Sequence, residues 1–445
     1  MGIRRQAGRI TVRVALPATI VTLLMAAAGQ GSAVVSAQVP SFAPPAMPQE
    51  LDADPEAVAV ADVTGDGRRD VLVTTSLLSG RSTYDASLLL FEQRPDGSLG
   101  PARKLADTSL HSAPLAAGDL DSDGDTDVVI ATRNAVLILW YGAGGLAAPV
   151  PLPDSPPGRP RDVEIADMDG DGRRDIVVSA QDDGIVPAEI AVLHNTGVGF
   201  ERRQVAEGWM MELEIGDVSG DGRPDIVAWG WGGGARVFVW RQTGSGWSPA
   251  DHITVGATPT DSVNAVEAAD VTGDGRTDVV VAGGGNVPGS YVRVLQQRTD
   301  GSLAAPVRYP SADIPEAVEA ADLNGDGLRD VVVLHTGSLV LGIYLQQADG
   351  TLTPEGTRYA PTAYHDSSGL ALSDLSGDGR IDIVAADWGY GRAPMVLRQR
   401  DAAGPMEPPT TTLHSGPPSN TTSRNATFTF SSDEPAALFE CFFDL

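Results

Sequence analysis

The sequence predicts an all-β protein, a seven-bladed β-propeller. Loops of the form Asp-x-x-x-Asp-Gly-x-x-Asp occur seven times, beginning at Asp62, Asp119, Asp167, Asp217, Asp270, Asp322 and Asp374. Successive loops are 57, 48, 50, 53, 52 and 52 residues apart, so each belongs to one copy of a repeated unit. No apolar period of 3.6 residues runs long enough to indicate a helix. Four-stranded units repeated seven times match a propeller, in which each blade buries its faces against its neighbours.

The strands of each unit follow in a constant order. A lead-in segment such as 316–322 precedes the loop, and the ninth loop residue opens a β-branched run such as 330–334, which indicates a buried strand. A second apolar stretch such as 291–297 and a turn come next. A short strand such as 303–309 then completes a unit of four strands.

The loops have the composition of a calcium site. In Asp167-Met-Asp-Gly-Asp-Gly-Arg-Arg-Asp175, carboxylates occupy positions 1, 3, 5 and 9 and glycine occupies position 6. A hard cation such as Ca²⁺ takes about six to eight oxygens, and a tight loop with an oxygen at every second residue surrounds it. Position 3 is Asp, Asn, Thr or Ser, each of which offers an oxygen, and position 7 contributes its backbone carbonyl.

We therefore predict up to seven Ca²⁺ ions, bound by positions 1, 3, 5, 7 and 9 of the loops. In the first four loops these positions are Asp62, Thr64, Asp66, Arg68 and Asp70; Asp119, Asp121, Asp123, Asp125 and Asp127; Asp167, Asp169, Asp171, Arg173 and Asp175; and Asp217, Ser219, Asp221, Arg223 and Asp225. In the last three they are Asp270, Thr272, Asp274, Arg276 and Asp278; Asp322, Asn324, Asp326, Leu328 and Asp330; and Asp374, Ser376, Asp378, Arg380 and Asp382.

Two other readings of the loops are less consistent with the sequence. An EF-hand shares positions 1, 3, 5 and 6 but requires a bidentate Glu at position 12 and flanking helices, whereas position 12 is always Val, Ile or Ala here. The loops could instead be plain Asp-Gly turns between strands. Seven copies with the same three aspartates favour metal binding over simple turns.

The loop strings resemble FG-GAP/VCBS repeats, which occur in integrin α-subunit propellers and in secreted bacterial proteins. The resemblance is carried by Asp-Val-Thr-Gly-Asp-Gly-Arg-x-Asp at 62–70 and 270–278 and by Asp-Leu-Asn-Gly-Asp-Gly-Leu-Arg-Asp at 322–330, and it extends over residues 41–400. It implies a seven-bladed propeller with Ca²⁺ in the loop that joins the first two strands of each blade. A full set of seven loops points to the bacterial type.

The amino-terminal end of the propeller is expected to complete its last blade. Residues 41–48 align with the fourth-strand stretch 302–309, and both lead into Pro-Glu-Ala-Val, at Pro55 and Pro315. The seventh unit ends after Leu397-Arg-Gln-Arg-Asp, before any fourth strand. We therefore predict a propeller over 38–404 whose ring closes by pairing of its two ends.

Residues 1–37 have the layout of a secretory signal peptide. Four arginines precede the apolar run 14–28, and Val35-Ser-Ala37 suits cleavage. An uncleaved membrane anchor is the alternative, but the run has 15 residues and includes Pro17, whereas about 20 are needed to span a bilayer. We expect a secreted or surface-attached bacterial protein with no transmembrane segment after cleavage.

The carboxyl-terminal end changes composition. Residues 405–425 are rich in Pro, Thr and Ser and are predicted to be a linker. Residues 426–445 resemble the start of a bacterial immunoglobulin-like module, in which Cys441 would pair with a later cysteine, but Cys441 is the sole cysteine. Such a short segment is too small for a sandwich, so the module is expected to be truncated.

Charge and motifs exclude several function classes. The formal charge is −28, and 23 of the 59 acidic residues are aspartates at positions 1, 3, 5 and 9 of the loops, so much of the acidity is that of the metal sites. Lys104 is the only lysine and there is no basic patch, which argues against nucleic acid as a partner. The chain has six histidines but no His-Glu-x-x-His, Gly-x-Ser-x-Gly or Gly-Lys-Ser/Thr motif, so we predict no enzyme activity.

Aromatic residues gather where the blade order places the face opposite the calcium loops. They include Tyr84, His111, Tyr364 and His365, and the predicted ligand face consists of Trp209, Trp229, Trp231, Trp388 and Tyr390. Exposed aromatics suit sugar rings or a protein partner, although packing between blades is an equal alternative. The expected function is recognition by a monomeric propeller of a surface protein, in cell adhesion, or of a carbohydrate, as in a lectin; a secreted polysaccharide hydrolase or lyase is the third alternative.

Overall fold

The computed structural model describes residues 10–13, 40–43, 45–51, 53–76, 86–108, 113–132, 135–156, 158–181, 188–208, 210–230, 234–244, 246–256, 261–359, 367–387, 393–400, 411–415, 429–432 and 440–443. The chain forms two compact units. The larger unit is Val35–Arg400, and the smaller unit combines Met1–Val34 with Asp401–Leu445.

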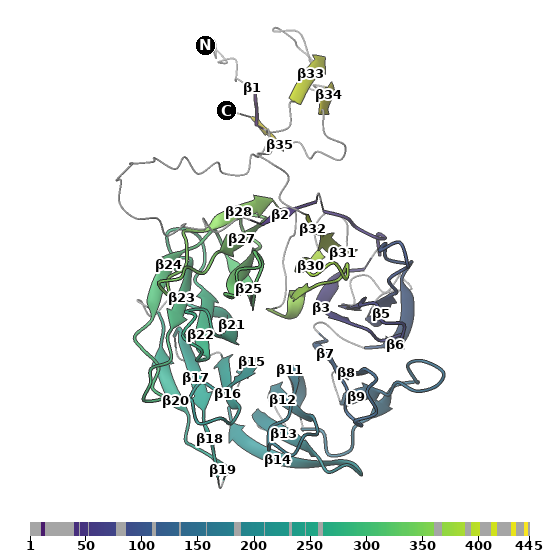
Figure 1. The fold of residues 1–445 in the computed structure, drawn as a ribbon, viewed down its shortest axis with the longest axis vertical. Helices are drawn as coiled ribbons and strands as arrows, with labels where there is room; N and C mark the ends of the chain where they lie inside the picture. Colours follow the sequence, from purple (N-terminus) through teal and green to yellow (C-terminus); the bar gives the residue numbers. More distant parts are fainter. Residues whose placement is uncertain are drawn as a thin grey trace, which may run out of the picture. The chain divides into compact units, whose positions relative to one another are not determined.

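The larger unit is a ring of seven antiparallel sheets (Figure 1), as the sequence predicts. Six sheets have four strands each. In chain order, the first sheet contains β3 (Pro55–Ala61), β4 (Asp70–Thr75), β5 (Ser87–Phe91) and β6 (Arg103–Asp107), and the second contains β7 (Leu115–Gly118), β8 (Asp127–Ala131), β9 (Val136–Leu139) and β10 (Val150–Pro151). The third contains β11 (Arg159–Ala166), β12 (Asp175–Gln181), β13 (Glu189–Asn195) and β14 (Phe200–Glu207), and the fourth contains β15 (Met210–Gly216), β16 (Asp225–Gly230), β17 (Arg236–Trp240) and β20 (Asp251–Thr254). The fifth contains β21 (Val263–Ala269), β22 (Asp278–Gly283), β23 (Tyr291–Leu295) and β24 (Val307–Pro310), and the sixth contains β25 (Pro315–Ala321), β26 (Asp330–His335), β27 (Val340–Tyr344) and β28 (Gly356–Tyr359). We number these sheets as blades 1 to 6.

Blade 7 is built from both ends of the unit. Its own strands are β29 (Leu370–Ser373), which follows the short 3-10 turn η1 (Ser367–Gly369), β30 (Asp382–Asp387) and β31 (Ala393–Leu397). Strand β2 (Ser41–Phe42) pairs antiparallel with β32 (Gln399–Arg400), and Ala46 forms a two-way backbone bridge with Val396 of β31. The amino-terminal segment therefore lies where the other blades have a fourth strand, which supports closure of the ring by residues 41–48.

Burial explains the apolar runs. The second and third strands of the blades are largely buried, and those of blades 1 and 5 are buried at every position, because both faces of the blade are covered. The fourth strands are mostly exposed, as in β24. Seven hydrophobic clusters fill the seven interfaces between adjacent blades. The cluster between blades 7 and 1 includes Leu51 beside Val71 and Val384, so apolar packing also joins the two ends of the ring.

Blade 4 carries a small additional hairpin, β18 (Gln242–Thr243) with β19 (Gly246–Trp247). In the smaller unit, β1 (Ile10–Arg13) pairs with β35 (Glu440–Phe443), and β33 (Thr411–Ser415) pairs with β34 (Thr429–Ser432). The range predicted as a linker, 405–425, thus contains a strand, whose β-branched threonines suit that conformation. Most of the predicted signal peptide lies outside the described residues. Among the described residues, no helix has the length and apolarity to cross a membrane.

Removing the amino-terminal strand tests the closure of the ring. Deleting residues 39–48 leaves the edges of β31 and β32 unpaired and removes their partner strand, so we expect a lower melting temperature and a tendency to associate through the open edge. The matched control deletes residues 408–445, which lie beyond blade 7, and should melt like the parent. Equal melting temperatures of the two deletions would refute closure by residues 41–48.

Candidate functional site

The seven aspartate loops occupy the same place in every blade. Each begins directly after the first strand, and its ninth residue is the first residue of the second strand, as at Asp70 in β4 and Asp382 in β30. Seven equivalent loops thus join strands one and two of the seven blades. This is the position that the sequence predicts for them.

Hydrogen bonds from the backbone organise each loop around its first aspartate. In the fifth loop, Asp270 Oδ1 accepts from Gly273 N–H (2.7 Å), and Asp270 Oδ2 accepts from Gly275 N–H (2.8 Å). The corresponding pair of bonds is present in all seven loops. Positions 4 and 6 have positive φ in all seven loops, which explains why they are glycine. Ser122, at position 4 of the second loop, also has positive φ (65°) and is the one residue at these positions that is not glycine.

The ninth aspartate of each loop is buried. Its exposed fraction is 0% or 1% in all seven blades. Its Oδ1 accepts an N–H from a residue at the end of the third strand or two residues beyond it, with N to O distances of 2.7–2.9 Å. In five blades its Oδ2 also accepts the N–H of loop position 2. One carboxylate thus joins the loop, the second strand and the third strand.

Burial raises the pKa of six of these carboxylates despite their hydrogen bonds; the six are Asp70, Asp127, Asp225, Asp278, Asp330 and Asp382. The pKa of Asp225 and of Asp278 rises to about 6 and that of Asp330 to about 7, because burial disfavours the charged form and the other loop aspartates add like charge. The backbone N–H groups that donate hydrogen bonds to these carboxylates lower the pKa and partly offset the effect of burial. Seven such groups are costly to keep ionised without a nearby cation.

A side chain from the next blade closes most loops. The residue that donates its N–H to the ninth aspartate also extends its side chain to a backbone carbonyl of the preceding blade's loop. Gln297 Nε2 of blade 5 donates to Asp217 O of blade 4 (2.8 Å), and Tyr141 OH of blade 2 donates to Thr64 O of blade 1 (2.7 Å). Equivalent bonds come from Gln93, Asn195, Gln242 and Gln399. Six of the seven interfaces are bonded in this way.

These linking residues were not predicted from the sequence. In the sequence, they can be found as an Asn or Gln at or just beyond the end of the third strand of each unit. Six blades have such an amide, and blade 2 has Tyr141 instead. In blade 6 the residue is Gln346, which lies against Gly273 of the fifth loop; a Cβ at Gly273 would stand 2.7 Å from Gln346 Nε2.

The loop residues fit a metal ion. The carboxylate oxygens of Asp119, Asp121 and Asp127 lie within 4.8 Å of one another, as do those of Asp167, Asp169 and Asp171. At position 3, the buried hydroxyls of Thr64 and Ser376 have no hydrogen-bond partner among the described residues. In five loops an arginine at position 7 forms an ion pair with the aspartate at position 5, as between Arg223 Nη1 and Asp221 Oδ2 (2.9 Å). Calcium would compete with this exposed guanidinium for the carboxylate.

Of the predicted ligand face, only Trp229 lies in the described part of the chain. It is half-buried against the cluster between blades 4 and 5, and its Nε1–H donates to Glu212 Oε2 (2.7 Å). Glu212 Oε2 also accepts Val266 N–H of blade 5 (3.1 Å). Trp229 therefore stabilises the contact between blades. Trp209, Trp231, Trp388 and Tyr390 lie outside the described residues, as do Tyr84, His111, Tyr364 and His365.

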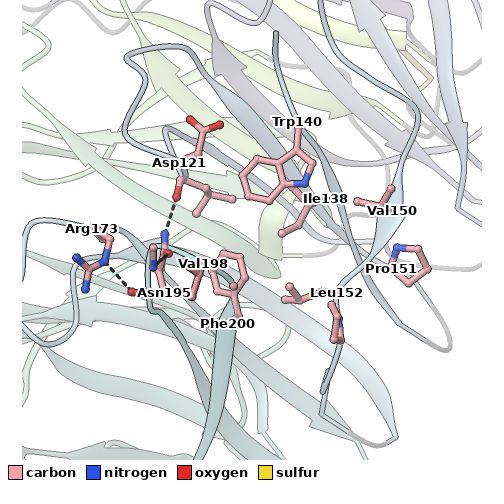
Figure 2. A pocket seen from close by; sticks show the side chains of 14 residues that line it. Asp121, Ile138, Trp140, Val150, Pro151, Leu152, Arg173, Asn195, Val198 and Phe200 are labelled. Atoms are coloured by element: carbon pink, nitrogen blue, oxygen red, sulfur yellow. Dashed lines mark hydrogen bonds between the residues drawn. The ribbon is translucent and has the colours of Figure 1, made fainter.

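A groove of about 320 Å³ lies between blades 2 and 3 (Figure 2). The half-buried rings of Trp140 and Phe200 line it, and its rim includes Val198, which is 97% exposed. Asp121 and Arg173 supply charges of opposite sign. An apolar wall with a few polar groups is typical of small-molecule and sugar sites. The sequence analysis did not predict this groove.

A buried polar cluster in blades 5 and 6 contains the residue types of a catalytic triad. Ser311 Oγ and Glu355 Oε1 both lie near the same nitrogen of His335, Nε2, at 2.8 and 3.1 Å. A triad needs the serine and the acid on opposite nitrogens of the imidazole. His335 is 0% exposed and burial lowers its pKa to about 4, so this histidine is neutral and inaccessible. The cluster is structural.

Four glutamates lie at the same position on the first strands of consecutive blades. They lie three residues before the first loop aspartate in blades 3 to 6, where the other blades have alanine, and they are Glu164, Glu214, Glu267 and Glu319. Burial and mutual repulsion raise the pKa of Glu164, Glu214 and Glu319 well above the ordinary value. Burial raises the pKa of Glu267 to about 7, with Arg329 opposing the shift.

The family of the chain follows from these loops. A model of the FG-GAP-like repeat matches residues 62–130, 119–178, 217–281, 270–333 and 322–385, which together include all seven loops and more than half of the chain. The chain belongs to the FG-GAP-like repeat family. Comparison of this FG-GAP-like repeat protein with curated proteins gave no match.

Solved structures share the propeller fold of this FG-GAP-like repeat protein at low identity. A lectin from Agrocybe aegerita that recognises non-reducing terminal N-acetylglucosamine is 18% identical, with a TM-score of 0.51 over 79% of this chain and 86% of the lectin. BBS1N in its complex with ARL6DN is 13% identical, with a TM-score of 0.55 over 83% and 99%. A virginiamycin B lyase from Staphylococcus aureus is 14% identical, with a TM-score of 0.50 over 80% and 99%. At these identities the likeness establishes the fold alone.

The buried glutamate of the polar cluster predicts a pH-dependent stability. Burial raises the pKa of Glu355 from 4.5 to about 7 in the folded state. Its stabilising contribution is therefore complete below pH 4.5 and is lost as the pH rises to 7. We expect Glu355→Gln to exceed the parent by about 3 kcal/mol in unfolding free energy at pH 8.5 and to equal it near pH 4.5. Denaturant unfolding at both pH values in chelator measures this, and a constant difference between them would contradict it.

Proposed function

We propose that this FG-GAP-like repeat protein is an extracellular propeller that binds Ca²⁺ in its loops and serves recognition, in cell-surface adhesion. The observation that carries the proposal is the set of seven ninth-position aspartates, each at most 1% exposed. A buried carboxylate is costly to keep ionised unless a cation lies nearby, even where backbone N–H groups donate to it. In blade 7 Arg398 Nη1 lies 3.4 Å from Asp382 Oδ2, and in blade 3 His194 Nδ1 lies 3.4 Å from Asp175 Oδ2; among the described residues, no arginine or lysine forms an ion pair with the other ninth-position aspartates.

Calcium suits the remaining ligands of the loops. The oxygens at positions 1, 3 and 5 and the carbonyl at position 7 form a hard, all-oxygen set, which favours Ca²⁺ over softer metals. The second loop has five aspartates at alternate positions and no arginine at position 7, and the third loop has four. The second loop, which has the most carboxylates, should therefore bind Ca²⁺ most tightly, because ligand charge raises affinity.

Recognition is the activity that the rigid ring supports. The interfaces between blades are filled by seven apolar clusters, which leaves the loops and outer strands available to contact a partner without loss of the fold. The buried Ser311, His335 and Glu355 cluster has neither the geometry nor the access of a catalytic site. Export through the predicted signal peptide would bring the protein to a calcium-rich medium, which the loops require.

Carbohydrate binding is the second candidate function, and the groove between blades 2 and 3 favours it. Trp140 and Phe200 offer flat apolar surfaces, and Asp121 and Arg173 offer charged hydrogen-bonding groups beside them (Figure 2). Sugars bind by stacking of their C–H faces on aromatic rings and by hydrogen bonds to their hydroxyls. The lectin with a similar fold shows that a propeller of this general form is compatible with such a ligand.

Removal of Ca²⁺ tests the first proposal. Seven sites, each stabilised by about 3 kcal/mol at saturating Ca²⁺, should raise the melting temperature by roughly 10–30 °C over that in excess chelator. Asp278→Asn should bind one Ca²⁺ fewer by elemental analysis, whereas Asp300→Asn, an exposed turn residue outside the loops, should bind as many as the parent. Unchanged melting of protein shown to have lost its metal would count decisively against calcium loops.

A glycan array tests the second proposal. We expect Val198→Asp, which alters the groove rim at an exposed side chain, to weaken binding of the retained glycan at least about tenfold while preserving the melting temperature. Trp140→Ala should weaken binding further. The double variant Trp209→Ala with Trp231→Ala should bind like the parent; loss of binding there, with the groove variants unaffected, would assign the ligand to the predicted aromatic face instead.

A further inference from the structure

The third loop differs from the others in having a histidine directed at it. His194, in β13, is 7% exposed, and its Nδ1 has no hydrogen-bond partner among the described residues. This nitrogen lies 3.4 Å from Asp175 Oδ2 and 3.5 Å from Asp169 Oδ2. The three ligand atoms lie within 4.8 Å of one another. A buried nitrogen without a partner thus points into a cluster of carboxylates.

The residue equivalent to His194 also contacts the loop in blades 5 and 7, but it is a different type of residue there. It is the residue before the amide that binds the ninth aspartate. In blade 7 it is Arg398, whose Nη1 lies 3.4 Å from Asp382 Oδ2 and adds a fixed positive charge. In blade 5 it is Gln296, whose Nε2 donates to Asp274 Oδ2 (2.9 Å). His194 is the one histidine at this position, the other residues being Glu92, Trp140, Arg241 and Leu345.

An imidazole changes which metals a loop prefers. Ca²⁺ and Mg²⁺ are bound by oxygen ligands, whereas a neutral imidazole nitrogen suits Zn²⁺ and related transition-metal ions. Nδ1 can coordinate when the imidazole proton is on Nε2. Carboxylates complete many zinc sites together with histidine.

We propose that the third loop is a transition-metal site of the Zn²⁺ class, in which His194 Nδ1, Asp169 and Asp175 are ligands. This inference rests on the proposal that the loops bind metal, and it assigns a different ion to one of them. The ring would then carry Ca²⁺ in its all-oxygen loops and one zinc-class ion in blade 3. The consequence is a protein whose metal content depends on two different cations.

Competition between the two metals tests this assignment. Untagged full-length protein is stripped with chelator, saturated with Ca²⁺ and titrated with Zn²⁺ by calorimetry and with Co²⁺ by visible absorption. We expect one equivalent of Zn²⁺ to bind in the presence of excess Ca²⁺, and Co²⁺ to give the d–d bands of a nitrogen-containing site. His194→Asn, which replaces the nitrogen with an amide, should weaken Zn²⁺ binding by about 100-fold or more. His252→Asn, at an exposed histidine of β20, is the matched control and should bind Zn²⁺ like the parent.

Two further measurements keep the result decisive. Asp169→Asn should also weaken Zn²⁺ binding and should fold, because the sixth loop has Asn324 at this position. In parent protein labelled with ¹⁵N-histidine, Zn²⁺ should shift one Nδ1 resonance. Unchanged Zn²⁺ affinity in His194→Asn, or complete displacement of Zn²⁺ by Ca²⁺, would overturn the assignment while leaving calcium stabilisation intact. Zn²⁺ binding through His194 without any effect of Ca²⁺ on melting would instead refute the calcium proposal alone.

Discussion

The buried aspartate at the start of each second strand is the constraint on which the propeller depends. Its two oxygens accept hydrogen bonds from the loop before it and from a residue at or just beyond the end of the third strand, so one side chain sets the relative position of three segments. Because it is buried, replacing it or leaving it unpaired costs more than a surface contact would. This explains why the ninth position is Asp in all seven loops while position 3 varies among four residue types.

The loops are coupled around the ring as well as within blades. The residue that binds the ninth aspartate through its backbone also binds the preceding loop through its side chain, at six of seven interfaces. An ion that orders one loop would therefore hold a carbonyl that the next blade uses. Apolar clusters fill the same interfaces, and the polar links add directional hydrogen bonds between neighbouring blades.

The repeat made the architecture predictable, because loop spacing and the apolar runs that follow each loop are local features of the chain. The strand order of the blades and the place of the loops follow directly from them. The linking side chains were harder to predict because the hairpin between strands two and three varies in length: Tyr141 comes 14 residues after Asp127, whereas Gln93 comes 23 residues after Asp70. The contact of His194 with the third loop depends on strand register, which a sequence without a fixed hairpin length does not specify. For Trp229 the sequence could not decide the role, because an aromatic residue in a hairpin is equally consistent with a ligand contact and with packing between blades.

The pairing of β2 with β32 orders events during synthesis of the chain. Strand β2 leaves the ribosome among the first parts of the propeller, yet its partner is among the last, so its backbone groups remain without their partner while every intervening blade is made. Blades 1 to 6 consist of local hairpins, whereas closure requires the longest-range contact of the ring and is therefore expected to be the slowest step of folding. The open intermediate, with one free strand and one incomplete sheet, is the state most exposed to swapping between copies, and it persists until the last blade is complete.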